Sequence, residues 1–253
     1  MAKDFTLATY RLFLEALIDQ EYHCCSYLHQ IENSPAKFIV LRHDVDKRPN
    51  NSLATAQLQK SLGITGTYYF RCVDDSFHPA VIEEIASLGH EIGYHYEDLS
   101  LANGNVEQAK VHFEKWLEKL RAFYPVKTIC MHGSPLSKTD NRDIWKSLNY
   151  RDYDIVGEPY FDLDFNEVLY ITDTGRSWNK SQVSVRDKVD SGYNYKFKST
   201  FDLIEQIKQG KLPNKIMQNI HPQRWTDDGL SWVSELVAQN AKNVIKRALF
   251  VKK

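Results

Sequence analysis

Residues 38–46 read FIVLRHDVD, an apolar run that ends in a histidine and two aspartates. The apolar part, 38–42, has the length and the aliphatic composition of a buried strand. Comparable short runs follow along the chain, at 65–70, around Ile92, and at 127–131, 167–171 and 215–220. Strands that alternate with helical patterns predict a mostly parallel sheet with crossover helices, which at this chain length closes into a barrel or nearly so.

Helical periodicity delimits the rest of the chain. We expect helices over 5–19, 50–62, from Pro79, over 105–123 and 141–148, from Ser199 and over 228–247. No repeat or low-complexity linker divides the 253 residues, so we expect a single domain over 1–253. The stretch 150–200 has no clear period, and we interpret it as an irregular functional loop region or as additional sheet.

The composition excludes several classes of protein. Hydrophobic residues make up 42% and charged residues 26% of the chain, values that are typical of folded globular proteins. The 32 Lys and Arg almost cancel the 33 Asp and Glu, so no excess positive charge favours nucleic acid as a partner. The chain shows no apolar run of membrane-spanning length, no secretory signal and no disulfide-like spacing of its four cysteines. We therefore expect a cytoplasmic protein without a transmembrane segment.

Titratable side chains follow the predicted strands, at the edge where a parallel barrel carries its active site. They are His43, Asp44 and Asp46; Asp74 and Asp75; His95, Glu97 and Asp98; His132; Asp173 and Arg176; and His221 and Arg224. Asp44 and Asp46 give the strongest signal. Two carboxylates one residue apart project the same way from an extended segment, and they repel each other unless a cation or a shared proton relieves them. Of the two, a bound metal ion is the commoner way to relieve this repulsion.

Three motifs carry a resemblance to a known family. RHDVD at 42–46, GHEIGYH at 89–95 and the apolar run that ends at His221 resemble the metal-dependent polysaccharide deacetylases, also called the NodB homology family or carbohydrate esterase family four. The resemblance spans 38–221 in the family's order. It implies an α/β fold, a distorted (β/α)7 barrel of parallel strands. It also implies a divalent metal ion, with zinc ranked first, and hydrolysis of the acetamido group of a sugar.

The resemblance assigns roles to individual residues. It makes Asp44 the general base, His221 the general acid, and Asp46 and His95 metal ligands. The strings MHGSPLSKTDNRD and HPQRW are similar to a divergent branch associated with bacterial surface-polysaccharide biosynthesis. The implied substrate is then an N-acetylated sugar of such a polysaccharide.

Two departures from the family pattern leave alternatives open. The family completes its metal site with a second histidine four residues after the first, where this chain has Leu99. We rank Glu97 first as the third ligand, followed by Asp98 and His132, because carboxylate oxygen and imidazole nitrogen both bind such ions. The arginine that orients the base is missing from its usual place, and Arg42 or Arg176 could supply it. The partner of the general acid is not assigned.

Substrate contacts are expected from aromatic and basic residues near the strand ends. We assign this role to His132, Arg176, Trp178 and Arg224, because aromatic rings stack on sugars and arginine grips acidic groups. The predicted function is a metal-dependent carbohydrate deacetylase. The alternatives are an inactive sugar-binding or scaffolding homologue, which the leucine favours, and a different metal-dependent amidohydrolase or phosphoesterase on the same barrel. The sequence assigns no oligomeric partner.

Overall fold

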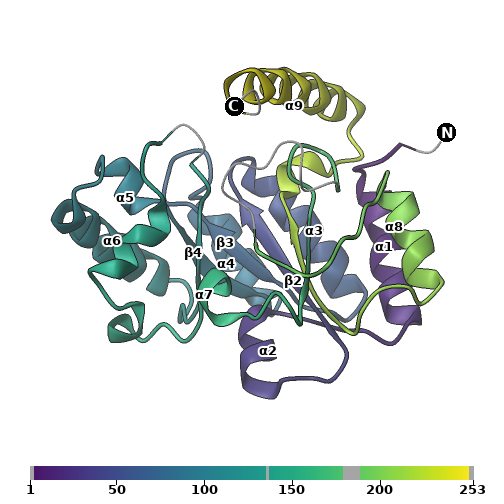
Figure 1. Ribbon diagram of the computed structural model, residues 1–253, viewed down its shortest axis with the longest axis horizontal. Helices are drawn as coiled ribbons and strands as arrows, with labels where there is room; N and C mark the ends of the chain where they lie inside the picture. The colour runs from purple at the N-terminus through teal and green to yellow at the C-terminus, as the bar shows by residue number, and fades with distance from the viewer. Residues whose placement is uncertain (1–2, 135–136, 179–188, 251–253) are drawn as a thin grey trace.

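Within the described part of the chain, a sheet of seven strands runs through the centre of the protein, and its paired strands are parallel. The computed structural model describes residues 3–134, 137–178 and 189–250. The strands are β1 (His23–Cys25), β2 (Phe38–Val45), β3 (Thr67–Phe70), β4 (Glu91–Tyr96), β5 (Ile129–Met131), β6 (Leu169–Thr172) and β7 (Lys215–Ile220). Their order is β5-β4-β3-β2-β7-β6, with β1 beside the first half of β2. In the described part, β5 and β6 do not pair with each other, so the sheet forms a curled half-barrel within the expected α/β fold (Figure 1).

Most of the helices connect the strands or cover the sheet, whereas α9 (Gly229–Phe250) follows the last strand and lies apart from them (Figure 1). The helices before it are α1 (Leu7–Asp19), α2 (Tyr27–Asn33), α3 (Pro49–Ser61), α4 (Pro79–Ser87), α5 (Asp98–Leu101), α6 (Val106–Arg121), α7 (Pro159–Asp162) and α8 (Thr200–Lys208). Three 3-10 helices are η1 (Asn141–Lys146), η2 (Tyr150–Tyr153) and η3 (Pro222–Arg224). In the ranges that the structure covers, no helix is both long and apolar enough to cross a membrane.

Side-chain caps fix several helix starts. Thr6, Ser26, Asn105 and Ser199 each accept a hydrogen bond from the backbone N–H three residues ahead. Such a bond satisfies one of the donors that a helix leaves free at its first turn. The predicted helix over 5–19 is therefore confirmed as α1, which starts directly after its Thr6 cap.

The central strand is longer than the sequence predicted. β2 continues through the polar residues His43 and Asp44, because β3 pairs with it over Arg42–Val45. All eight of its residues are buried. Since side chains alternate along a strand, Arg42 and Asp44 share one face and His43 points to the other.

Apolar side chains fill the space between the sheet and its helices. One cluster packs α1 and α8 against Ile39, Leu41 and Ile216, and a second packs α4 and α6 against strands β3 and β4. The stretch 150–200 contains η2, α7 and β6, and residues 179–188 within it lie outside the described part. The polar residues that follow β2, β4, β5 and β7 lie outside these apolar clusters, at the carboxyl ends of the strands.

Candidate active site

Asp44 is buried near the carboxyl end of β2 and is clamped by neighbours in the sheet. Arg42 donates from Nε to Oδ1 at 2.9 Å and from Nη2 to Oδ2 at 2.7 Å. Asn219 of β7 donates to Oδ2 at 2.8 Å. Burial alone would raise the pKa of Asp44, but the charge of Arg42, with His95 and His221, holds it well below its usual range. Asp44 is therefore a carboxylate at neutral pH.

Three histidines turn their Nε2 atoms toward the carboxylate of Asp46, which follows β2. Nε2 of His132 lies 3.6 Å and Nε2 of His95 lies 3.8 Å from Oδ1, whereas Nε2 of His221 lies 3.9 Å from Oδ2. Gln223 donates to Oδ2 at 3.3 Å. Burial alone would raise the pKa of Asp46, but the imidazoles favour the charged form and lower it to about 2. The residues come from the ends of β2, β4, β5 and β7, so the sheet itself brings them together.

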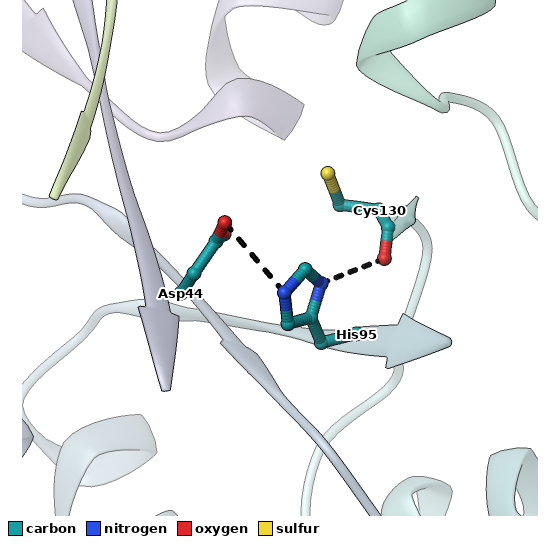
Figure 2. Close-up of side chains that lie close together, drawn as sticks. All are labelled: Asp44, His95 and Cys130. Atoms are coloured by element: carbon teal, nitrogen blue, oxygen red, sulfur yellow. Dashed lines mark hydrogen bonds and ion pairs between the residues drawn. The ribbon is translucent and has the colours of Figure 1, made fainter. Parts of the chain in front are cut away.

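His95 is held in one orientation by the neighbouring strand. Its Nδ1 lies 2.9 Å from the backbone oxygen of Cys130, and its Nε2 lies 3.6 Å from Oδ2 of Asp44 (Figure 2). A carbonyl oxygen only accepts, so Nδ1 carries the hydrogen and the neutral ring keeps its lone pair on Nε2. Burial lowers the pKa of His95 to about 4, which keeps the ring neutral at pH 7. Nε2 is buried and has no hydrogen-bond partner among the described residues.

His132 is oriented in the same manner by Glu97. Its Nδ1 lies 2.7 Å from Oε2 of Glu97, whose other oxygen accepts from Arg71 at 2.7 Å. Burial alone would raise the pKa of Glu97, but the bond and charge of His132, together with Arg71, lower it to about 2. The structure thus places Glu97 behind His132, with both oxygens engaged, and not beside His95. The first-ranked third ligand is therefore not among the grouped donor atoms.

His221 is oriented by Asp173, which follows β6. Nδ1 of His221 donates to Oδ1 of Asp173 at 2.6 Å. The same carboxylate accepts from Nη1 of Arg224 at 2.6 Å and from Nε1 of Trp225 at 2.8 Å. Burial alone would raise the pKa of Asp173, but Arg224 and His221 hold it lowered. Arg224, predicted to grip the substrate, instead positions the carboxylate behind His221.

Among the residues that the structure describes, two groups of side chains have donor atoms close enough to hold a metal ion, and one of them fits a cation. They are Asp46 with His95 and His132, and Asp44 with His95 and Cys130. In the first group, Asp46 Oδ1 and His95 Nε2 are buried with no hydrogen-bond partner in the described chain, which is costly unless a cation binds there. Oδ1 of Asp46 lies 3.8 Å from Nε2 of His95 and 3.6 Å from Nε2 of His132. These distances suit ligands that are each about 2.0–2.2 Å from one zinc ion. In the second group, the carboxylate of Asp44 is already paired with the guanidinium of Arg42.

The side chain at the place of the family's second histidine and the candidate ligand Asp98 both have other partners. Leu99, at the place of the family's second histidine, is 4% exposed and packs in the hydrophobic core. Asp98 accepts from the hydroxyl of Tyr94 and bonds to Nδ1 of His112. Neither residue belongs to the groups that could hold an ion.

Two predicted substrate contacts, Trp178 and Arg176, pack against neighbouring aromatic rings. Trp178 is 2% exposed and packs against the rings of Phe5 and Phe13, so no face of it is open to a sugar. The guanidinium of Arg176 lies 4.8 Å from the ring centre of Phe5 and 5.0 Å from that of Trp232. These residues join the N-terminal segment and α9 to the body of the protein.

Gly93 lies two residues before His95 on the same face of β4. A Cβ atom at this position would lie 2.3 Å from Cε1 of Tyr69 and 3.0 Å from the backbone oxygen of Thr128. The ring of Tyr69 fills the space and lies 6.5 Å, centre to centre, from the ring of His95. Only glycine allows this approach between β3 and β4.

Sequence reasoning missed some of the supporting residues. Of the two arginines considered for Asp44, the structure uses Arg42, and the signal was the two-residue period that puts both on one strand face. Asn219 was missed, although the pairing of Arg42 with Asn219 in β2 and β7 brings it to the clamp. Asp173 was noted at a strand end, but its pairing with His221 depends on β6 lying beside β7.

Comparison with known proteins gives likenesses in structure alone. No family model matches the chain, and no curated protein matches it in sequence. A CE4 family pseudoenzyme from Bacillus anthracis matches over 83% of this chain at 14% identity with a TM-score of 0.47, and the match spans 61% of that protein. A family 4 carbohydrate esterase from Streptomyces lividans, in complex with acetate, matches over 81% of this chain and 88% of its own at 14% identity and a TM-score of 0.46. A Streptococcus mutans CE4 esterase matches over 87% and 85%, at 14% identity and 0.45.

Proposed function

We propose that the protein is a metal-dependent deacetylase that hydrolyses the acetamido group of an N-acetylated sugar and yields acetate and a free amine. The observation that carries the proposal is the convergence of His95 and His132 on Asp46, next to the ionised Asp44. The motif resemblance supplies the substrate class, an N-acetylated sugar of a bacterial surface polysaccharide.

The proposed ligands are Asp46, His95 and His132, so that His132 takes the place first given to Glu97. Three nitrogen and oxygen ligands with one open position are typical of catalytic zinc. A bound zinc ion supplies a Lewis acid for the substrate carbonyl and lowers the pKa of water toward about 7. The hydrogen bonds that Nδ1 of His132 donates to Glu97 and Nδ1 of His95 donates to the Cys130 carbonyl hold the two rings in place for this role.

Asp44 accepts the proton of the attacking water in this proposal. Its carboxylate has four lone pairs, of which the bonds from Arg42 and Asn219 use three. The remaining lone pair can receive a proton as the water oxygen bonds to the carbonyl carbon. The guanidinium of Arg42 keeps Asp44 ionised before the reaction and fixes its direction.

His221 gives a proton to the leaving nitrogen as the C–N bond breaks. Its Nδ1 is bonded to Asp173, so Nε2 is the nitrogen that faces the site. The buried carboxylate of Asp173 stabilises the imidazolium form that carries this proton. Each of the two proton transfers contributes about 10²–10⁴-fold to the rate.

The test is acetate release from N-acetylglucosamine oligosaccharides by zinc-loaded protein. Asp44→Asn should lower turnover by about 10²–10⁴-fold while zinc content stays the same. Asp74→Asn makes the same chemical change at an exposed position, so it should leave turnover unaltered. Undiminished turnover in Asp44→Asn would remove Asp44 as the base. Zinc binding without hydrolysis of any N-acetylated sugar would contradict the deacetylase and favour a sugar-binding homologue.

A further inference from the structure

A cavity of about 460 Å³ lies between η1, η2 and α7. This volume is in the range of protein pockets that hold small molecules. The residues that line it include Arg142, Trp145 and Lys146 of η1, Tyr150 of η2 and Phe161 of α7. None of these residues takes part in the proposed hydrolysis, so the cavity calls for an explanation of its own.

Two sets of contacts connect this cavity with the candidate active site. Asn141, the first residue of η1, donates from Nδ2 to the backbone oxygen of His132 at 2.9 Å. The guanidinium of Arg142 lies 5.4 Å from the ring centre of Tyr160. The hydroxyl of Tyr160 accepts from Nη1 of Arg42 at 3.3 Å, and Arg42 is the arginine that clamps the proposed base. A single ring, that of Tyr160, therefore joins the cavity to the proposed base and its clamp.

Hydrogen bonds hold the walls of the cavity in place. Asp162 of α7 accepts from Nη2 of Arg151 at 2.7 Å and from the hydroxyl of Tyr150 at 2.9 Å. The same carboxylate accepts from the backbone N–H of Glu158 at 2.7 Å. The ring of Trp145 packs edge-on against that of Tyr150, at 5.4 Å between centres. Walls that are fixed in this way lose little conformational freedom when a ligand binds.

Phe161 presents an aromatic ring at this cavity. It is 48% exposed, and in the described chain it is the one aromatic residue among the large hydrophobic side chains that are exposed. Its ring lies 6.2 Å from that of Tyr150, centre to centre, at an interplanar angle of 16°. An exposed aromatic face gains free energy when an apolar surface, such as the C–H face of a sugar ring, covers it.

The charged groups of the lining form two ion pairs. Nη2 of Arg142 lies 2.7 Å from Oδ2 of Asp140. Nζ of Lys146 lies 2.8 Å from Oδ1 of Asp143. Each pair sets donors beside acceptors, which is the arrangement that neighbouring hydroxyls of a sugar need. The two positive and two negative charges cancel, so the lining favours a neutral ligand rich in hydroxyls over an anion or a cation.

We infer that this cavity binds one sugar unit of the carbohydrate chain whose acetylated unit lies at the proposed zinc ligands. The sugar ring stacks on Phe161, and its hydroxyls bond to the two ion pairs. The substrate is then an oligosaccharide or a polysaccharide and not a single sugar. The identity of the bound chain rests on the proposed function, whereas binding at Phe161 is measured without hydrolysis.

The test is titration calorimetry of the full chain in metal-free form, with N-acetylglucosamine and its β-1,4-linked tetramer as ligands. We expect the tetramer to bind at least about tenfold more tightly than the monosaccharide, because only the tetramer reaches the cavity. Phe161→Ala should reduce this ratio of affinities by about tenfold, since the stacking surface is lost. Phe161→Tyr retains an aromatic ring and should keep most of the ratio.

A matched control separates the cavity from general surface apolarity. Leu12 of α1 is 48% exposed, as is Phe161, and α1 lies well apart from α7 (Figure 1). Leu12→Ala should therefore bind the tetramer as the wild type does, and circular dichroism checks that each variant is folded. No binding of the tetramer, equal affinity for the two ligands, or the same loss in Leu12→Ala would overturn the inference.

Acetate release by zinc-loaded protein distinguishes a failure of this inference from a failure of the proposed function. If tetramer binding depends on Phe161 but no acetate is released, the hydrolysis fails and the cavity remains a carbohydrate-binding site. If acetate is released equally well from both sugars, by the wild type and by Phe161→Ala alike, the hydrolysis stands and the inference fails.

Discussion

Buried histidines in two regions of the sheet differ in how many of their ring nitrogens have hydrogen-bond partners. Away from the candidate site, both nitrogens of His43 and of His90 are bonded, to backbone groups and to the side chains of Tyr10 and Gln59. The three histidines at the carboxyl edge each use Nδ1 for a fixed partner and turn Nε2 toward Asp46. Burial lowers the pKa of His95 as it lowers the pKa of His43 and His90, so ring charge does not separate His95 from the other two.

The difference teaches that the number of hydrogen-bond partners, and not burial or sequence position, separates His43 and His90 from His95. His43 is the immediate neighbour of Asp44, yet it faces the other side of β2 and completes a network with Tyr10. His95 is equally buried, and its Nε2 remains without a hydrogen bond among the described residues. An unpaired buried nitrogen is costly, so its presence points to a ligand.

The largest effect is expected behind His221, where the outer partner of the ring is a carboxylate. Asp173→Asn keeps the shape of the side chain but removes the charge that stabilises the protonated imidazole. We expect turnover to fall by about 10²–10⁴-fold. Zinc content should stay unchanged, because His221 is not among the grouped ligands. Unaltered turnover, measured as acetate release, would show that orientation by Asp173 is unimportant.

Exchanging a histidine for phenylalanine in each region tests the comparison directly. His95→Phe should lower zinc affinity by more than about a hundredfold, since changes in outer partners alone cost 10–100-fold. The unfolding free energy of the metal-free protein should fall by about 1–2 kcal/mol, because the Cys130 carbonyl loses its bond to Nδ1 while the unpaired Nε2 is removed as well. Zinc titration and urea unfolding measure the two quantities.

The same exchange at His43 should give the opposite result. His43→Phe removes the ring nitrogen shared by Tyr10 and Gln59 and the donor to the carbonyl of Thr67, so the unfolding free energy should fall by about 2–4 kcal/mol. Zinc affinity of the folded fraction should not change. If both variants lost metal equally, the distinction between the two regions would fail.

A smaller effect is expected at Glu97. Glu97→Gln retains a side chain that can bond to Nδ1 of His132 but removes its charge. Zinc affinity should fall by about 10–100-fold, as is usual for partners of ligating histidines. A competition titration with a chelator measures it. A far larger loss would instead indicate that Glu97 binds the ion itself.

For a single histidine and a single pH unit, the smallest effect is a pH dependence of stability. Burial lowers the pKa of His43 to about 3 and that of His90 to about 4, below the unfolded value near 6.5. Between these limits the unfolded chain binds more protons, so the unfolding free energy should decline as the pH falls from about 6.5 to 4. Each such histidine contributes at most about 1.4 kcal/mol per pH unit. Urea unfolding of metal-free protein should show a shallower decline in His43→Phe; an identical slope would count against the assignment.

Local pattern was enough to predict most of the fold. The apolar stripe of α6, the capping residue Ser199 and the run that became β7 each carry their signal within a few turns or residues. Short elements such as β1, with three residues, carry too little pattern to be found. The extension of β2 through His43 and Asp44 depends on its pairing with β3, which is a contact between separate parts of the chain.

The candidate site divides in the same way. The strand-end pattern brought attention to Asp46, His95, His132 and His221, which the structure groups, while their roles stay proposals. The choice between Glu97 and its rivals could not be made locally, because the distant Arg71 holds that carboxylate. In the same way, the burial of Trp178 depends on packing with the N-terminal segment, which no nearby pattern reveals.

Gly93 limits the substitutions that this sequence can accept. Because the ring of Tyr69 occupies the room that any larger residue would need, a replacement would push β3 from β4 and displace His95 with them. A survey of tolerated substitutions would then rank this glycine beside the acids and imidazoles, although it touches no reacting group. Close packing beneath a candidate site can therefore constrain the identity of a motif residue as strongly as a chemical role does.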